Sequence, residues 1–260
     1  MIVYITGCCG GIGQELVKKY IDKRYTVVGI DINESALDQM SLDSGHLFYP
    51  SLIDLTKKKE SKNGLKKVLE QYGVPDVFIH CAGIVTLKPF LNETETEFYK
   101  VMEINFLSFK RILDIIMPVM EEKGGVIVPV SSVAGLVSAP LLGSYSASKA
   151  ALISYSEVVQ KELSLKNSSV TLCLVCPGFI DTPLIRVGDE GGFPDYLKPL
   201  LSKPTRVAEI VTQAIEKKKS YVDPTVSGKV ISFLDRISPK VVSTLSKKAL
   251  SKGMLKLFKD

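Results

Sequence analysis

The sequence predicts an α/β protein in which a doubly wound parallel sheet is covered by helices on both faces, giving three layers. Short apolar segments rich in β-branched residues alternate with segments of helical periodicity from the first residues onward. Strands that are separated by helices pair in parallel, because each crossover must carry the chain back over the sheet. Residues 126–130 are apolar on both faces of the expected strand, which is typical of a strand covered on both sides.

The expected elements follow one another in a regular order. Strands are expected at residues 2–6, 26–30, 47–53, 76–80, 126–130 and 170–175, with a short last strand beginning at 221–222. Helices are expected at residues 11–23, 34–40, 57–72, 98–120, 144–166 and 205–218. The first helix has the plainest pattern, since Ile12, Leu16, Val17 and Tyr20 recur at helical spacing. No linker or low-complexity segment divides residues 1–230, so we expect a single domain there, followed by a basic amphipathic tail at 231–260.

Several classes of protein are disfavoured by composition. Five cysteines in 260 residues do not make a disulfide framework. Cys173 and Cys176 have CxxC spacing but fall in an apolar strand, and no second pair completes a zinc site, so no metal is expected. The first residues are already strand-like, without a signal peptide, and no run approaches the roughly 18 apolar residues of a membrane span. We therefore expect a soluble, cytoplasmic protein.

A glycine-rich turn joins the first expected strand to the first helix. It reads Thr6-Gly7-Cys8-Cys9-Gly10-Gly11-Ile12-Gly13. Glycines allow positive φ angles and a close approach of the backbone to a pyrophosphate, and the helix N-terminus offers free N–H groups to the anion. A glycine pattern alone is weak evidence for phosphate binding, but this one lies between a strand and a helix, which is the context that phosphate binding requires. The turn predicts a Rossmann-type dinucleotide-binding domain.

Asp31 ends the second expected strand, close to the spacing of about 20 residues expected for a ribose-binding carboxylate. Such a carboxylate accepts hydrogen bonds from the ribose hydroxyls and repels a 2′-phosphate. No Lys or Arg lies in the glycine turn or directly after Asp31 to bind that phosphate. NAD(H) is therefore favoured over NADP(H). The alternative is an acidic residue that merely caps a strand.

Seven motifs in order resemble those of the short-chain dehydrogenase/reductase family, over residues 2 to about 218. They are Thr6, Gly7, Gly11 and Gly13 of TGxxxGxG, then Asp54-Leu55, Ala82-Gly83, Asn105, Ser131-Ser132, Tyr145 to Lys149 of YxxxK, and Pro177-Gly178 with Thr182 of PGxxxT. The resemblance implies an oxidoreductase that acts on CH–OH groups. It implies cofactor contacts at Thr6, Gly7, Gly11, Ile12, Gly13, Asp31, Asp54, Leu55, Ala82, Gly83, Tyr145, Lys149, Pro177, Gly178 and Thr182.

The resemblance also implies a catalytic set. Tyrosine has an unperturbed pKa of about 10, too high for a base near neutrality. Lys149 lies one helical turn after Tyr145, and its ammonium favours the phenolate. The family pattern makes Tyr145 the general acid/base and Lys149 its electrostatic partner and ribose anchor. In the same pattern Ser132 binds the substrate oxygen, and Asn105 holds the water of a proton relay through Lys149. Each residue alone also fits an ordinary structural role.

The sequence departs from the family pattern in two places. His80 and Cys81 stand where the family more often has two asparagines, and we expect His80 to be a core histidine with altered local hydrogen bonds. The C-terminus lacks the family's glycine-rich finish, which puts a tetramer in doubt. A homodimer through the two long helices, at residues 98–120 and 144–166, is the expected assembly.

Residues 236–260 of the tail carry seven basic residues and one acidic residue, a net charge of +6 against +5 for the whole chain, so the body is nearly neutral and nucleic-acid binding is not indicated. Val241, Val242, Leu245 and Ala249 recur in the tail at near-helical spacing. We hypothesise that the tail is a peripheral contact with an anionic membrane surface. The alternative is a helix that covers the substrate pocket or a partner subunit, with its lysines in solvent.

The substrate is predicted only by class. The segment 183–203 follows the PGxxxT motif, is rich in apolar residues and is expected to be a lid, in which Leu184 would contact substrate together with Ser132 and Tyr145. This predicts an apolar substrate body with a secondary alcohol or ketone, such as a steroid, a hydroxyacyl chain or another lipid. Two other functions stay open: an NAD(H)-binding sensor or scaffold without turnover, and an epimerase or dehydratase that retains NAD.

Overall fold

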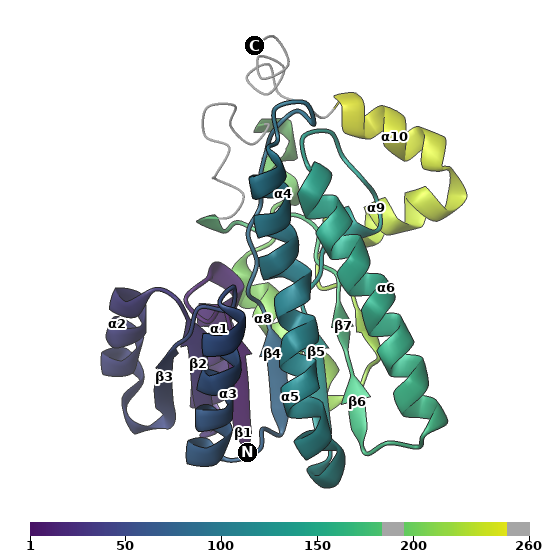
Figure 1. Cartoon of the computed structure of the whole chain (residues 1–260). Helices are drawn as coiled ribbons and strands as arrows, with labels where there is room; N and C mark the ends of the chain where they lie inside the picture. The colour runs from purple at the N-terminus through teal and green to yellow at the C-terminus, as the bar shows by residue number, and fades with distance from the viewer. Residues whose placement is uncertain (184–194, 249–260) are drawn as a thin grey trace.

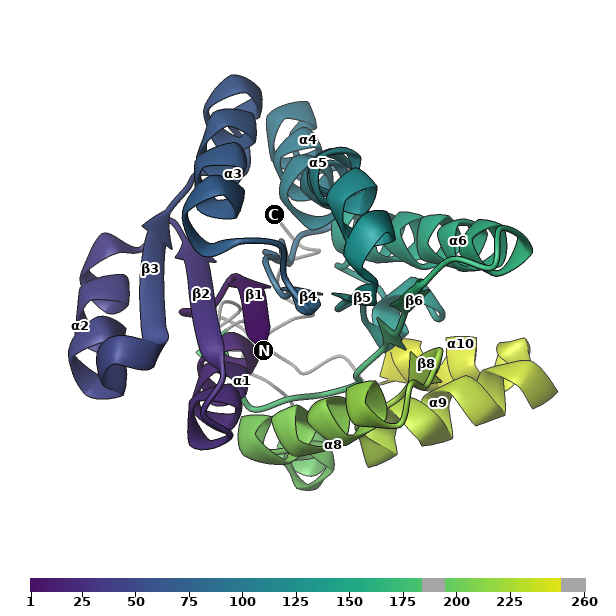
Figure 2. The ribbon, with the colours of Figure 1, turned by 90° about the horizontal axis from the view of Figure 1, so that it is seen from below.

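The structure is a computed structural model that describes residues 1–183 and 195–248. Its centre is a six-stranded parallel sheet in the order β3-β2-β1-β4-β5-β6 (Figures 1 and 2). The strands are β1 (Ile2–Thr6), β2 (Thr26–Asp31), β3 (Phe48–Leu52), β4 (Val77–His80), β5 (Gly125–Pro129) and β6 (Val170–Leu172). The strand order reverses between β1 and β4, and ligands of such sheets bind at the carboxyl ends of the strands beside this reversal.

Helices cover both faces of the sheet, as Figure 2 shows in a view along the layers. One face carries α3 (Lys58–Tyr72), α4 (Glu95–Met102), α5 (Ser108–Lys123) and α6 (Gly143–Leu165). The other face carries α1 (Gly11–Asp22) and α8 (Pro204–Glu216), with α9 (Val226–Ile237) and α10 (Pro239–Lys248) at its edge. The predicted doubly wound, three-layer fold is confirmed.

The alternation of side chains along the strands produces two separate cores. On β1, Val3 and Ile5 belong to the cluster that packs under α1 and α8, whereas Tyr4 belongs to the cluster under α3, α5 and α6. Tyr4 is fully buried, and its hydroxyl donates to the carbonyl oxygens of Val68 (3.1 Å) and Gly73 (2.5 Å). The central strand therefore ties both layers of helices to the sheet.

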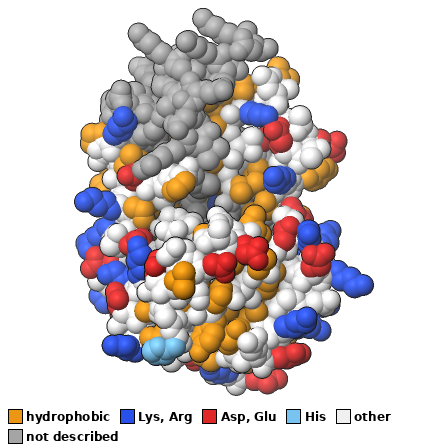
Figure 3. All heavy atoms as spheres, turned by 90° about the vertical axis from the view of Figure 1, so that its left-hand side faces the viewer, with side chains coloured by type: hydrophobic (Ala, Val, Ile, Leu, Met, Phe, Trp, Pro, Cys, Tyr) orange, Lys and Arg blue, Asp and Glu red, His pale blue; other side chains and the backbone are white. Residues whose placement is uncertain are grey.

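The edge of the sheet at β3 is flanked by α2 (Glu34–Ser44). β3 contains Pro50, which has no N–H to offer to a further strand, as suits an edge strand. Figure 3 shows this side of the molecule, where acidic and basic side chains are interspersed with hydrophobic ones. Positive charge is not concentrated on this face.

The long helix expected at 98–120 has a different start and an interruption. Thr94 and Glu97 form a capping box, so α4 begins at Glu95, before the apolar pattern does. A π-helical turn, η2 (Glu103–Leu107), then separates α4 from α5. A π-turn adds one residue to a helix locally, and the apolar periodicity of the sequence does not reveal such an insertion.

The strand expected at 170–175 is divided. β6 ends at Leu172, and β7 (Leu174–Val175) pairs instead with β8 (Tyr221–Val222). An isolated β-bridge between Val130 and Val175 places β7 alongside the residue that follows β5. After β8 comes α9, which spans residue 230 and begins at a cap where Thr225 Oγ1 accepts from Gly228 N. Within the described ranges, no helix is long and apolar enough to cross a membrane.

Candidate active site

The glycine turn lies at the carboxyl end of β1, where the strand order reverses. Gly7 has φ +66°, and a Cβ there would lie 2.6 Å from Ala82 N. A Cβ on Gly13 would lie 2.2 Å from the carbonyl oxygen of Gly7. Both positions therefore exclude any larger residue. Between them, the side chain of Ile12 packs against the core under α1 and anchors the start of the helix.

The PGxxxT segment packs against two distant parts of the chain. A Cβ on Gly11 would lie 2.6 Å from Thr182 Cγ2, so this motif ends beside the glycine turn. Gly178 N donates to Thr225 Oγ1 at 2.7 Å, and a Cβ on Gly178 would lie 2.5 Å from Gly228 N. The turn from Pro177 therefore lies directly on the first turn of α9.

Asp31 is fixed by the backbone around it. Its Oδ2 accepts from Cys9 N at 3.0 Å, and its Oδ1 accepts from Ile32 N (2.8 Å) and Asn33 N (3.1 Å). The carboxylate is half-buried at the end of β2, next to the glycine turn. It is therefore held in place by three N–H donors before any ligand binds.

Asp54 and Leu55 follow β3 at the same edge of the sheet, and Ile53 N donates to Asp31 O at 3.0 Å. Asp54 Oδ1 accepts from the Thr56 hydroxyl (2.7 Å) and Thr56 N (2.9 Å), and the hydroxyl hydrogen bond holds the pKa of this carboxyl below its usual value. Leu55 is buried. The residues expected to bind the adenosine half of a dinucleotide thus lie side by side.

Tyr145 and Lys149 lie on the first turns of α6, and both are buried. The Glu93 carboxylate accepts from Ser144 Oγ and from Ser144 N (3.3 Å), so a negative charge stabilises the N-terminal end of this helix. Lys149 Nζ lies 5.8 Å from the centre of the Tyr145 ring and donates to the carbonyl oxygen of Val130 at 3.0 Å. The helix therefore presents both groups at the carboxyl end of β5.

Ser132 follows β5 and faces the same site. Its hydroxyl accepts from Ala134 N at 3.1 Å and lies 3.5 Å from Pro177 O. Burial raises the pKa of the Tyr145 phenol, and a hydrogen bond with Ser132 opposes that rise. Burial also lowers the pKa of Lys149 to about 8.

Asn105 is buried in the π-turn, and its amide joins three segments. Its Nδ2 donates to Ile84 O and to Ser148 Oγ, both at 2.9 Å, while its Oδ1 accepts from Ile84 N at 2.8 Å. Ser148 Oγ in turn donates to Tyr145 O at 2.8 Å. Ser148 was not among the predicted site residues. Its position three residues after Tyr145, on the same helix face, is the signal that could have found it.

Gly83 lies over the junction between Asn105 and Lys149. A Cβ at this position would be 3.3 Å from Asn105 Oδ1 and 3.4 Å from Lys149 Nζ. Gly83 therefore lies close to both polar groups, and even one methyl group at this position would touch them.

His80 lies in the core beneath the site. Its Nδ1 is 2.9 Å from Thr6 Oγ1, its Nε2 is 3.5 Å from Ser108 Oγ, and its ring packs against Phe109. Burial lowers the pKa of His80 to about 3, and the charge of Lys149 acts in the same direction. The ring is therefore neutral and structural, and it braces β4 against β1 and α5. The neighbouring Cys81 thiol has a pKa raised to about 12 by burial.

The predicted substrate contact Leu184 lies outside the described residues. In the segment between Ser132 and Tyr145, Leu141 is buried and Leu136 is exposed.

Comparison with known proteins identifies the class of this chain. A family model described as "short chain dehydrogenase" matches residues 1–190, so the chain belongs to the short-chain dehydrogenase/reductase family. It is accordingly an oxidoreductase with a nicotinamide dinucleotide cofactor.

Two curated relatives cover most of the chain. The 3-oxoacyl-[acyl-carrier-protein] reductase FabG of Thermotoga maritima is 30% identical over 235 residues, which are 87% of this chain and 95% of that protein. Estradiol 17-beta-dehydrogenase 11 of Mus musculus is 28% identical over 244 residues, which are 92% of this chain and 80% of that protein.

Solved structures have the same fold. A short-chain dehydrogenase from Streptomyces avermitilis superposes with a TM-score of 0.80 at 23% identity, covering 95% of this chain and 96% of that one. A short-chain dehydrogenase/reductase from Burkholderia phymatum, in complex with NAD, gives a TM-score of 0.81 at 21% identity, with 93% and 95% covered.

Proposed function

We propose that this protein uses NAD(H) to interconvert a secondary alcohol and a ketone on a mainly apolar, lipid- or steroid-like substrate. The observation that carries the proposal is the convergence of Ser132, Tyr145, Lys149 and Asn105, from three different segments, at the carboxyl edge of the sheet. An enzyme that moves a proton there has a use for all four groups, whereas a protein that only binds NAD(H) has no need of them together.

The residues present fit a dinucleotide. Gly7 and Gly13 allow the backbone to approach a pyrophosphate, and the first turn of α1 supplies N–H groups. Lys149 has three N–H donors, and among the described residues its ammonium has one acceptor, Val130 O. The remaining donors suit the hydroxyls of the nicotinamide ribose.

Tyr145 is the proposed general acid/base. The nicotinamide, when bound, gives or accepts the hydride. In the reducing direction the Tyr145 hydroxyl donates its proton to the carbonyl oxygen, and Ser132 holds that oxygen by a hydrogen bond. The ammonium of Lys149 stabilises the phenolate that forms, and its pKa of about 8 leaves it mostly charged at neutral pH.

Asn105 and Gly83 are proposed to hold the water through which Lys149 is reprotonated. Both N–H donors of the Asn105 amide are used, by Ile84 O and Ser148 Oγ. Its Oδ1 accepts one hydrogen bond, from Ile84 N, and therefore keeps a second lone pair. The space over Gly83 borders both this oxygen and Lys149 Nζ. A water there would accept from the lysine and donate to Asn105.

NAD(H) is proposed over NADP(H) because of Asp31. Its carboxylate is fixed at the end of β2 and repels a 2′-phosphate. The residues that donate to it are backbone N–H groups of Cys9, Ile32 and Asn33, and none of these three side chains is basic.

The apolar substrate is supported by two observations from different sources. The segment 183–203, expected to cover the site, is rich in apolar residues. The names of the Thermotoga and mouse relatives specify a 3-oxoacyl chain and a steroid, each with an apolar body beside the reacting oxygen.

The test is to titrate NADH and NADPH separately into the protein and into Tyr145→Phe, and to assay both on a panel of hydrophobic ketones. Tyr99→Phe, an exposed tyrosine on α4, is the matched control. NADH binding by all three proteins, with turnover lost only in Tyr145→Phe, is the expected result. NADH binding without Tyr145-dependent turnover would favour the sensor, scaffold or epimerase functions. Tighter binding of NADPH would refute the role of Asp31.

We also propose that the protein is a homodimer through α5 and α6. Val158 on α6 and Leu107 beside α5 are exposed apolar residues on these two elements. Light scattering should give a dimer for the unchanged protein and a monomer for Val158→Glu. A monomer before substitution, or a dimer that survives it, would contradict this interface.

A peripheral membrane contact is proposed for α9 and α10, because α9 has its polarity reversed. Val226, Val230, Phe233 and Ile237 recur on one face of the helix and are exposed. The opposite face, with Ser227 and Gly228, is buried. α10 adds two exposed apolar residues, Val241 and Leu245. An outward apolar face of this kind suits the interface of a bilayer.

Charge specifies which surface these helices would bind. Lys229, Arg236, Lys240 and Lys247 are exposed on the two helices, and Asp235 is the acidic residue among them. Vesicles that contain phosphatidylserine should sediment the protein, and phosphatidylcholine vesicles should do so far less. Phe233→Glu should abolish the binding, whereas Leu165→Glu, an exposed leucine on α6, should preserve it. A dimer dissociated by Phe233→Glu, without vesicle binding, would assign this face to a second copy instead.

A further inference from the structure

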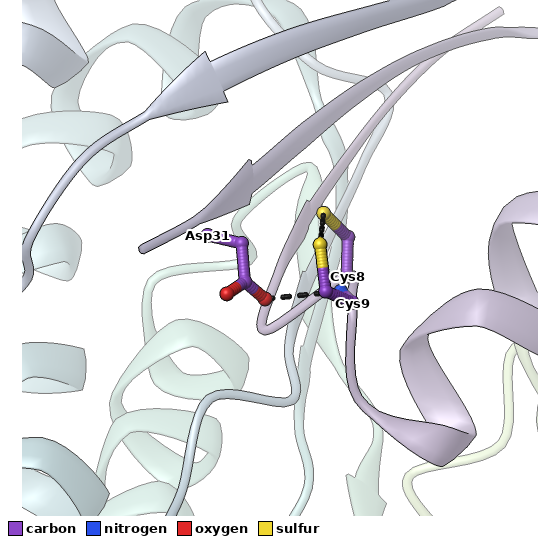
Figure 4. A group of neighbouring side chains, drawn as sticks. All are labelled: Cys8, Cys9 and Asp31. Carbon is purple, nitrogen blue, oxygen red and sulfur yellow. Dashed lines mark hydrogen bonds between the residues drawn. The ribbon is translucent and has the colours of Figure 1, made fainter. Parts of the chain in front are cut away.

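Two thiols and a carboxylate meet beside the glycine turn. Cys8 and Cys9 are consecutive residues of that turn, and Asp31 ends the neighbouring strand β2 (Figure 4). The two sulfur atoms are 3.9 Å apart, and one ligand atom from each of the three residues lies within 4.8 Å of the others. The oxidoreductase chemistry proposed above uses neither thiol.

The spacing of the sulfur atoms matches a tetrahedral metal site. With Zn–S bonds of about 2.3 Å and tetrahedral angles, two sulfur ligands of one zinc ion lie about 3.8 Å apart. The two thiols already have this separation. Sulfur ligands select soft cations such as zinc and cadmium over magnesium or calcium.

The three ligands are held from different sides. Cys8 is fully buried, with its Sγ beside Gly29 of β2, where an added Cβ would be only 2.8 Å away. The Asp31 carboxylate is fixed by three backbone N–H groups, one of them from Cys9 itself. Cys9 and Asp31 are half-buried, so the fourth position of a tetrahedral ion would face solvent.

From this geometry we infer that Cys8, Cys9 and Asp31 bind a soft divalent cation, zinc or cadmium, and that the bound cation excludes the dinucleotide. The exclusion rests on the proposed function, in which Asp31 binds the adenosine ribose. A carboxylate that ligates a metal beside the glycine turn cannot accept hydrogen bonds from both ribose hydroxyls. Binding of metal and cofactor is therefore mutually exclusive, and the cation is an inhibitor that acts through the cofactor site.

The first measurement is cadmium titration of the full, metal-free protein, followed by the ultraviolet absorption of cadmium–thiolate bonds. One cadmium per chain, with an absorption typical of two thiolates, is expected, and zinc should displace it. Cys8→Ala and Cys9→Ser should each remove most of the signal. Cys173→Ser changes a buried cysteine of the core and should leave it unchanged. A signal that survives in the Cys8→Ala/Cys9→Ser double variant would overturn the site.

The second measurement is NADH binding at increasing zinc concentration, with the unchanged protein. The apparent Kd for NADH should rise linearly with free zinc from its zinc-free value and return to that value when a chelator is added. This measurement uses only the unchanged protein, so its outcome does not depend on whether a variant folds. Simultaneous binding of cadmium and NADH would overturn the exclusion. Failure of the proposed function looks different, because NADH would then not bind even to metal-free protein while the cadmium signal remained.

Discussion

Asn105 and Ile84 are joined by a reciprocal pair of hydrogen bonds. Ile84 N donates to Asn105 Oδ1 at 2.8 Å, and Asn105 Nδ2 donates back to Ile84 O at 2.9 Å. The side chain of the π-turn thereby replaces a neighbouring strand as the partner of the segment that follows β4. Its second N–H reaches Ser148 on α6, so one amide connects the sheet edge to both long helices.

Asn105→Asp tests this connection with a side chain of the same size. It removes both donors and places a carboxylate oxygen against Ile84 O. We expect a loss of about 1–3 kcal/mol in the free energy of unfolding, together with a fall in kcat. Asn63→Asp, at an exposed position of α3, is the matched control and should be neutral. Urea denaturation measures the free energy of unfolding of both variants, and equal stability of the two would contradict the role assigned to Asn105.

Gly83→Ala tests the space between Asn105 and Lys149. The new methyl group would lie at 3.3–3.4 Å from both polar atoms, close enough to displace a water without preventing folding. We expect kcat to fall by about 10²-fold, the lower range for losing a proton-transfer path, and NADH affinity to fall as well, because Gly83 is also an expected cofactor contact. Gly64→Ala adds a similarly tight methyl, 3.0 Å from Ile53 Cδ1, and should retain kcat. An unchanged kcat in Gly83→Ala would exclude the relay water.

Lys149→Met is expected to abolish turnover and yet stabilise the cofactor-free protein. The folded pKa of about 8 lies below the ordinary value of 10.5, so between these values the unfolded chain binds more protons. Stability of the unchanged protein therefore rises with pH across this window, and the cost of the buried charge is greatest below pH 8. The variant should gain about 1–3 kcal/mol at pH 7 and progressively less toward pH 10.

Thermal unfolding between pH 7 and 10 measures that difference. The control is Lys161→Met, an exposed position on the same helix, which should follow the unchanged protein at every pH. If Lys149→Met lowered the free energy of unfolding equally at pH 7 and at pH 10, burial of the lysine charge would have no net cost in stability.

His80 is expected to make the fold sensitive to acid. Its pKa of about 3 in the folded protein lies below the ordinary 6.5, so only the unfolded chain takes up a proton between these values. Stability is therefore full above pH 6.5 and falls as the pH drops, by about 1.4 kcal/mol per unit for one such group.

His80→Asn introduces the residue type common in the family and should reduce the loss of stability between pH 7 and pH 5. His46→Asn changes the other histidine of the chain, which is exposed, and should retain the full loss. The comparison uses the difference between the two pH values, because His80→Asn also loses contacts with Phe109 and Thr6 at any pH. Identical differences in the two variants would show that His80 is not the acid-sensitive group.

Local sequence signals predict the features of this protein that local chemistry determines. The glycine turn, the end of β2 at Asp31 and the pair Tyr145–Lys149 each depend on neighbours in the sequence, and they lie where expected. The π-turn at Asn105 could not be predicted, because it adds one residue to a helix whose apolar period continues on both sides. The break at Cys173 depends on where β8 pairs, which is a tertiary contact.

α9 was not predicted, although Val226, Val230, Phe233 and Ile237 have the helical spacing that could have located it. The outward orientation of these residues depends on tertiary packing of the opposite face, which the sequence pattern does not reveal. The meeting of Cys8 and Cys9 with Asp31 likewise depends on the register between β1 and β2, in which Thr6 is paired with Ile30. Residues that lie on different strands become neighbours only once this register is known.

Gly178 packs against Gly228, and the backbone N–H groups of Gly178 and Phe179 donate to Thr225 Oγ1 and Ser227 Oγ. The turn from Pro177, one of the expected cofactor contacts, is therefore in direct contact with the first turn of α9. By reciprocity, if occupation of the outer face of α9 alters dinucleotide affinity by some factor, dinucleotide alters attachment of that face by the same factor. The fraction of the oxidoreductase attached through this face would then depend on the concentration of the dinucleotide.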